Sequence, residues 1–161
     1  MAAAVEPTLS GGEQALLARR ETENPEAYRL YLTGRFFGSR MTAEGLNEAI
    51  RSYERAIQLD PRFALAHAGI ADANGMLGTW GFLPHNEAFP RAEQAALRAL
   101  ALDDRLAEAH TSLGYSKFRY SWDWPAAQQE FARAIALNPN YPTARQFYAC
   151  LLYTSPSPRD S

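Results

Sequence analysis

Two histidines in comparable positions are the first residues whose type could support chemistry. His67 and His110 each follow an alanine, Ala64 or Ala107, by three residues, and either could bind a metal ion through a ring nitrogen. Neither has a Cys, His or carboxylate partner at the spacing of a metal motif. His85 lies in a predicted loop, where we expect an exposed side chain. We therefore predict no metal site and no cofactor.

The acidic and aromatic residues at predicted turns offer two further candidates. Asp103, Asp104 and Asp123 stand where helix ends and caps are expected, and this position explains them without general acid–base catalysis. The three tryptophans are Trp80, Trp122 and Trp124. They could form an aromatic platform for a ligand, or they could fill the gaps between packed helices at the turns, and we favour the second interpretation. Since the sequence also has no phosphate loop or nucleophile elbow, we predict a non-enzyme without catalytic residues.

Composition is that of an ordinary globular chain. The 161 residues are 47% apolar and 21% charged, with a formal net charge of −2. The basic residues are scattered, so we expect no contact with nucleic acid. The sequence has neither an apolar run long enough to span a membrane nor the pattern of a secretory signal. We therefore expect no membrane insertion and a cytoplasmic location.

An internal repeat is the main signal in the sequence. Three segments place small and aromatic residues at successive offsets of four, three and five. The three sets are Ala49, Tyr53, Ala56, Pro61; Ala92, Ala96, Ala99, Asp104; and Ala127, Phe131, Ala134, Pro139. Offsets of four and three form one stripe along a helix, against which a neighbouring helix can pack closely.

Each stripe belongs to the second helix of a predicted pair. The first helices carry their own small and large residues, such as Tyr31 with Gly34 and Leu113 with Gly114, and Asn24-Pro25 is a helix start. Asn140-Tyr141-Pro142 begins a further first helix. Proline after a stripe ends the second helix, because it removes a hydrogen-bond donor and restricts the residue before it.

These residues resemble the tetratricopeptide (TPR) repeat family, whose pattern spans about 34 residues. The resemblance implies an all-α, right-handed α-solenoid of antiparallel helix pairs with about 3.5 units. The expected array is 23–149, with repeats near 25–61, 62–104 and 105–139 and a half repeat at 140–149. An insertion at residues 79–86 lengthens the second unit. In this family pattern His67 and His110 occupy a packing position.

A narrower resemblance concerns the parent protein. The Glu23–Tyr28 stretch, the Trp122-Asp-Trp124 turn and the helix expected before Asp104 are similar to repeats of bacterial multidomain regulators. This similarity implies a protein–protein interaction scaffold from a larger bacterial signalling or transcription regulator. The alternative is a non-catalytic substrate-docking domain of a multidomain kinase, cyclase or transferase.

The resemblance also implies a binding surface for a protein or peptide ligand on the concave face of the array. Outward positions of the first helices supply the candidate residues, which are Leu65, Ala68, Asp72, Met76, Glu108, Thr111, Tyr115, Arg119 and Gln146. Tyr115 and Arg119 are one turn apart and of types that often dominate interface energy. A family clamp for acidic peptide tails is disfavoured, since only Asn74 and Lys117 have suitable side chains.

Both ends of the chain depart from the repeat. Residues 1–22 are expected to be a linker with a short helix near 14–20, following an upstream domain. Residues 150–160 resemble the translation of a sequencing adapter, which predicts a non-native disordered tail at 150–161. An array that stops at a half repeat would leave Phe147 and Tyr148 partly uncovered and favour self-association.

Overall fold

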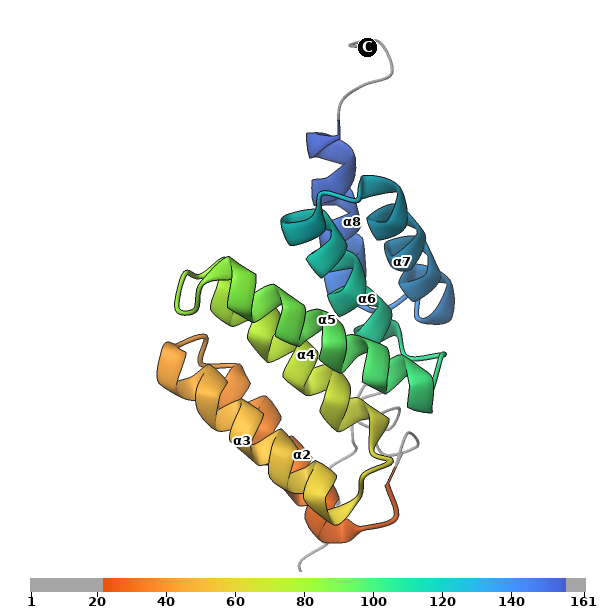
Figure 1. Cartoon of the computed structure of the whole chain (residues 1–161). Helices are drawn as coiled ribbons and strands as arrows, with labels where there is room; N and C mark the ends of the chain where they lie inside the picture. The colour runs from red at the N-terminus through yellow and green to blue at the C-terminus, as the bar shows by residue number, and fades with distance from the viewer. Residues whose placement is uncertain (1–21, 156–161) are drawn as a thin grey trace, which may run out of the picture.

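The computed structural model describes residues 22–155, which form an all-α chain without strands in that range. The helix pairs α2–α3, α4–α5 and α6–α7 follow one another along the array, and α8 comes after them at the far end (Figure 1). The helices are α2 (Pro25–Gly38), α3 (Ala43–Leu59), α4 (Ala64–Thr79), α5 (His85–Leu102), α6 (Ala107–Ser116), α7 (Trp124–Leu137) and α8 (Pro142–Thr154). A short π-helical segment, η1 (Lys117–Ser121), continues α6.

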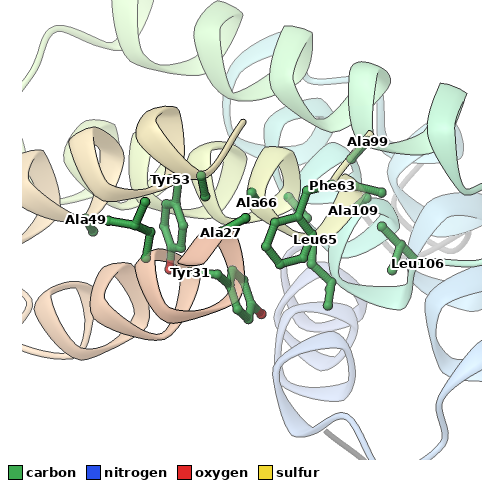
Figure 2. Packing of buried hydrophobic residues seen from close by; sticks show 14 residues of the cluster. Ala27, Tyr31, Ala49, Tyr53, Phe63, Leu65, Ala66, Ala99, Leu106 and Ala109 are labelled. Atoms are coloured by element: carbon green, nitrogen blue, oxygen red, sulfur yellow. The ribbon is translucent and has the colours of Figure 1, made fainter. Parts of the chain in front are cut away.

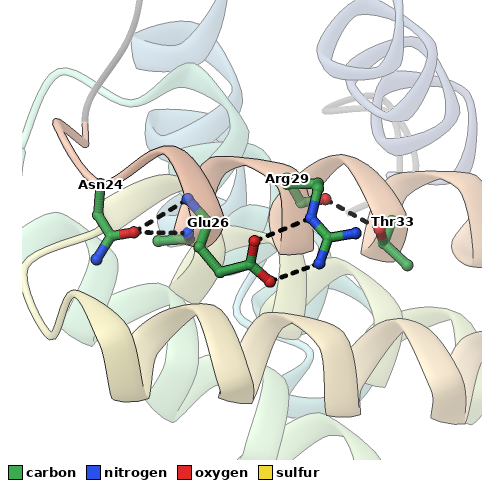
Figure 3. Close-up of polar contacts among 5 residues, drawn as sticks. Asn24, Glu26, Arg29 and Thr33 are labelled. Atoms are coloured by element: carbon green, nitrogen blue, oxygen red, sulfur yellow. Dashed lines mark hydrogen bonds and ion pairs between the residues drawn. The ribbon is translucent and has the colours of Figure 1, made fainter.

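The first helix begins where the sequence predicts. The Asn24 side chain accepts hydrogen bonds from the backbone N–H groups of Glu26 and Ala27 at 3.0 and 3.1 Å, and Pro25 follows it (Figure 3). Glu26 also pairs with Arg29 one turn later. This cap satisfies backbone donors that have no partner inside the helix.

The helices form two layers. Each helix packs against its neighbours in sequence, and α4 also contacts α2 and α6, while α6 contacts α8. Within residues 22–155, α3, α5 and α7 make no comparable contacts with one another. We call α2, α4, α6 and α8 the A layer. Because the A helices lie closer together than the helices of the other layer, the A layer forms the inner side of the array.

The repeated stripe is the packing core. All nine of its alanine and aromatic positions in α3, α5 and α7 are at most 5% exposed. Figure 2 shows Ala49 and Tyr53 of the first stripe together with Tyr31 and Phe63 from neighbouring segments. Burial of these apolar surfaces stabilises one pair against the next, as a repeat array requires.

Small residues of the A helices make room for the large residue of each stripe. The Tyr53 ring lies between Gly34 of α2 and Gly69 of α4, where an added Cβ would come within 2.5 and 2.7 Å of ring carbons. Phe131 lies against Gly114 in the same way, where an added Cβ would come within 2.9 Å of a ring carbon. The glycines predicted from the repeat therefore permit close helix approach.

Helix α8 runs past residue 150, the boundary expected from the sequence. Helix α8 continues to Thr154, and Leu151 is 2% exposed in a cluster with Phe131 and Phe118. The apolar Leu151 extends the α8 stripe by one turn beyond Phe147, so packing favours helix there. Residues 1–21, including the short helix predicted near 14–20, and residues 156–161 lie outside the described range.

No helix within residues 22–155 combines the length and apolar character needed to cross a bilayer.

Candidate functional site

The A layer carries a small hollow of about 10 Å³, enough for about one water molecule, at the meeting point of three helices. Asp72 and Met76 come from α4, Ser112 and Tyr115 from α6, and Phe147 from α8. Three of the residues predicted to bind a partner therefore line one surface depression. Its mixture of a carboxylate, a thioether and aromatic rings is amphipathic, as is common where peptides dock.

Tyr115 forms a fixed wall of this hollow. Its ring stacks on Phe147 with centroids 4.2 Å apart, and its hydroxyl group hydrogen-bonds Thr79 Oγ1 at 3.0 Å. The residue is only 9% exposed. The α8 helix thus covers a side chain that the sequence placed on an open surface, and a partner would meet only its edge.

Leu65 and Thr111 lie deeper than predicted. Leu65 is 5% exposed within the cluster that contains Tyr31 and Phe63, and Thr111 is 2% exposed. The Thr111 hydroxyl group donates to the Ala107 carbonyl oxygen at 2.7 Å, so its polar atom is already satisfied. Both residues support the A layer in this structure and offer little area to a ligand.

Of the other predicted residues, Ala68 is 2% exposed and the rest keep accessible side chains. Asp72, Arg119 and Gln146 are exposed, while Met76 and Glu108 are half-buried. Protein atoms around the Asp72 carboxyl group limit its hydration and raise its pKa, and the nearby Arg35 guanidinium group opposes this rise. Arg119 lies in η1, where the backbone no longer follows α-helical spacing, so its predicted alignment with Tyr115 is altered.

The two residues with side chains suited to an acidic-tail clamp lie elsewhere. Lys117 Nζ, at the start of η1, bonds Glu93 Oε1 of α5. Asn74 is 5% exposed and donates to the Ile70 carbonyl oxygen on the face of α4 away from Asp72. They do not converge on one ligand.

The two histidines differ in environment although they share a repeat position. His110 Nδ1 bonds Glu130 Oε2 at 2.6 Å, and Nε2 donates to the Asp104 carbonyl oxygen at 2.8 Å. Both ring nitrogens donate in the protonated form, so Glu130 and then the backbone contact raise the pKa of His110 despite burial. Burial lowers the pKa of His67.

Within residues 22–155, His, Cys, Asp and Glu side chains do not gather into a group of three or more that could hold a metal ion. The caps predicted from acidic residues are present at α7, where Asp123 accepts from the Ala126 N–H group at 3.1 Å.

The tryptophans divide between two roles. Trp124 is half-buried against the aromatic cluster, consistent with the predicted plug, although its indole N–H group is buried without an acceptor. Trp80 and Trp122 are 58% and 72% exposed, so the plug interpretation is wrong for them. Trp122 has a left-handed backbone, with φ of 55°, which turns the chain from η1 into α7 and directs the ring to solvent.

Sequence comparison identifies one repeat directly. Residues 45–78, which run from α3 to the end of α4, match the family model described as TPR repeat. No curated protein matches the chain in sequence.

Solved structures share the fold. The first TPR domain of Spaghetti, bound to the HSP90 peptide SRMEEVD, is 20% identical with a TM-score of 0.64, over 83% of this chain and 95% of that chain. The Sgt2 TPR domain of Aspergillus fumigatus is 19% identical with a TM-score of 0.66, over 84% and 82%. An O-GlcNAc transferase mutant from Thermobaculum terrenum is 20% identical with a TM-score of 0.64, over 86% of this chain and 25% of that one.

Proposed function

Because residues 45–78 are a tetratricopeptide repeat and the described chain has the fold of such domains, we propose that it is a non-catalytic protein–protein interaction scaffold. Its ligand is a peptide or partner domain that binds the A layer. The observation that carries this proposal is the A-layer surface around the small hollow between α4, α6 and α8, where Asp72, Met76 and Phe147 present polar and apolar groups together. The Spaghetti domain with its bound peptide supports it as a precedent for the fold.

The ligand we expect differs from an acidic tail. Asp72 is a carboxylate on the A layer, and neither Lys117 nor Asn74 points a donor at that surface. Like charges at an interface are unfavourable, so an acidic tail such as SRMEEVD would meet repulsion at Asp72. We therefore expect neutral or basic amphipathic segments to bind in preference.

A peptide-display selection followed by fluorescence anisotropy tests the proposal. Asp72→Lys and Gln146→Lys alter exposed positions on the A layer, whereas Gln129→Lys alters an exposed position on α7 in the other layer. We expect selected peptides to lose about tenfold or more in affinity with the first two variants and to keep their affinity with the third. Failure to select any peptide, or equal losses in all three variants, would contradict the proposal.

One comparison favours a second candidate function. The transferase from Thermobaculum terrenum contains a region of this fold within a chain about four times as long as the matched part. The chain could accordingly serve as a substrate-docking domain of a multidomain enzyme. Sequencing the flanking DNA in both directions separates the two: an adjoining kinase, cyclase or transferase domain favours docking, and a DNA-binding output domain favours the bacterial regulator that the sequence resembles.

We also propose weak self-association through the α8 end of the array. Phe147 and Tyr148 are half-buried, while Leu152 and Tyr153 are 53% and 93% exposed. Sedimentation velocity over a range of concentrations tests this: Leu152→Glu should reduce any dimer, and a monomer at every concentration for the unaltered chain excludes it.

A further inference from the structure

A second and larger groove lies on the other side of α4. It runs between α3 and α5, has a volume of about 390 Å³, and uses Ile70 and Leu77 of α4 as part of its floor. Asp72 of the A-layer hollow lies on the opposite face of the same helix, because it is two positions from Ile70 and five from Leu77, which places it about 160° and about 140° away from them around the helix axis. The two sites are therefore separate.

The floor of this groove is aliphatic and incompletely covered. Ile50 and Ile57 from α3 and Ile70 from α4 are half-buried, and they lie beside the buried Leu77. Aliphatic side chains of a ligand would remove this remaining surface from water, at a gain of roughly 25 cal/mol per Å² of apolar area. A volume of about 390 Å³ is also within the usual range for ligand sites.

The insertion in the second repeat closes one end of the groove. Leu83, which belongs to the inserted residues 79–86, lines the groove beside Leu77. Its position is fixed because the N–H groups of Phe82 and Leu83 both donate to the Leu77 carbonyl oxygen, at 2.9 and 3.1 Å. The departure from the usual repeat length thus contributes an apolar wall.

Charged residues on the two rims differ in sign. Arg91 and Arg98 stand on the α5 side, seven residues apart and so about 10.5 Å apart along the helix. Glu54 stands on the α3 side. Arg91 makes only an exposed pair with Glu87 at 3.4 Å, and Arg98 has no ion pair within residues 22–155. An exposed pair of this kind contributes little, so both guanidinium groups remain available.

We propose that this groove is a second protein-binding site whose occupant is an amphipathic helix with acidic residues seven positions apart. The same rise per residue places those carboxylates about 10.5 Å apart, opposite Arg91 and Arg98. Aliphatic residues at the third and fourth positions between them lie on the same helix face and enter the groove over Ile50 and Ile70. A basic residue of the bound helix, on the side away from Arg91 and Arg98, faces Glu54.

The test uses a fluorescein-labelled, hydrocarbon-stapled helix with Glu at the first and eighth positions and Ile at the fourth and fifth. A second probe carries Lys in place of both Glu residues. Arg98→Glu alters the groove, and Arg133→Glu is the matched control, because Arg133 follows Phe131 in α7 as Arg98 follows Ala96 in α5 and is also exposed. Anisotropy titrations give the affinity of each pair.

We expect the Glu probe to bind the unaltered chain, to lose about tenfold or more in affinity with Arg98→Glu, and to change by less than about twofold with Arg133→Glu. The Lys probe should bind Arg98→Glu better than it binds the unaltered chain. Asp72→Lys should leave the Glu probe unaffected, so that this result is independent of the A-layer proposal.

Three outcomes overturn the inference. The Glu probe does not bind the unaltered chain; the two arginine variants weaken it equally, which indicates non-specific attraction; or the unaltered chain dimerises and Arg98→Glu abolishes the dimer without any probe binding, which assigns the groove to a second copy of the chain.

Discussion

Two glycines in one helix provide a direct test of how the repeats pack. Gly69 and Gly75 both lie inside α4, but a Cβ added at Gly69 would lie 2.7 Å from the Tyr53 ring, whereas one added at Gly75 would have its nearest neighbour, Tyr115 Cδ1, at 3.9 Å. Gly69→Ala therefore requires a shift in the packing, and Gly75→Ala fits the space present.

The expected difference follows from two opposing effects. Alanine in place of glycine stabilises a helix interior by about 1 kcal/mol, and Gly75→Ala should show this gain. At Gly69 the ring cannot retreat, because Gly34 holds its other side and Tyr53 is 5% exposed. Overpacking of such a site costs about 3 kcal/mol at the upper end. Because the helix gain of about 1 kcal/mol offsets part of this cost, Gly69→Ala should destabilise the chain by about 2 kcal/mol.

Urea unfolding followed by circular dichroism measures the free energy of unfolding of each variant. The two variants should differ by about 3 kcal/mol, or by roughly 6–12 °C in Tm for a chain of this length. In a Tyr53→Leu background Gly69→Ala should cost much less than in the unaltered chain, since the smaller side chain removes the overlap. If Gly69→Ala is as stable as Gly75→Ala, the inferred wedge between Gly34 and Gly69 is wrong.

Three further measurements address other parts of the chain. NMR titration should find the pKa of His110 above that of His67, and the reverse order would contradict the contacts described. The contribution of His110 to stability is full below about pH 6.5 and is lost as the pH rises through its folded pKa. The contribution of His67 is lost as the pH falls through its folded pKa. Leu151→Ala should cost about 2–5 kcal/mol in urea unfolding, against about 0.5 kcal/mol for Leu152→Ala, because only Leu151 is buried; equal small effects would show that the last turn of α8 does not pack. Asp123→Ala should cost about 1 kcal/mol by removing the α7 cap, and Asp123→Asn should retain most of it.

The sequence predicted the packing core because a core of this kind is periodic. Tyr53 and Phe131 recur at the same offset from buried alanines, and helical geometry alone puts them on one face. The helix starts at Asn24 and Asp123 were also predictable, since capping depends on a side chain and the backbone next to it. Local rules sufficed for both features.

The binding surface depended on contacts that no local rule contains. The Tyr115 side chain is covered by Phe147, which lies thirty-two residues later in the sequence. Arg119 is moved out of alignment with Tyr115 by a π-helical segment that the α-helical pattern did not indicate. Leu65 falls at an outward position of its helix but is covered by residues of neighbouring elements. Exposure on a solenoid depends on how adjacent pairs tilt, and that tilt arises from side-chain fit across the whole array.

The insertion at residues 79–86 shows how such a departure from the repeat can acquire a function. The connection between α4 and α5, residues 80–84, is only one residue longer than that between α2 and α3, residues 39–42, and most of the extra length of this repeat lies in its helices. Such a small increase in loop length costs little. Here the added residues return to the helix end through the Leu77 carbonyl oxygen and place Leu83 against the α3–α5 groove. If the groove binds a helix as proposed, shortening this loop should weaken the Glu probe while leaving peptides selected on the A layer bound. Equal binding of the Glu probe before and after shortening would reduce the loop to a connection without a role in recognition.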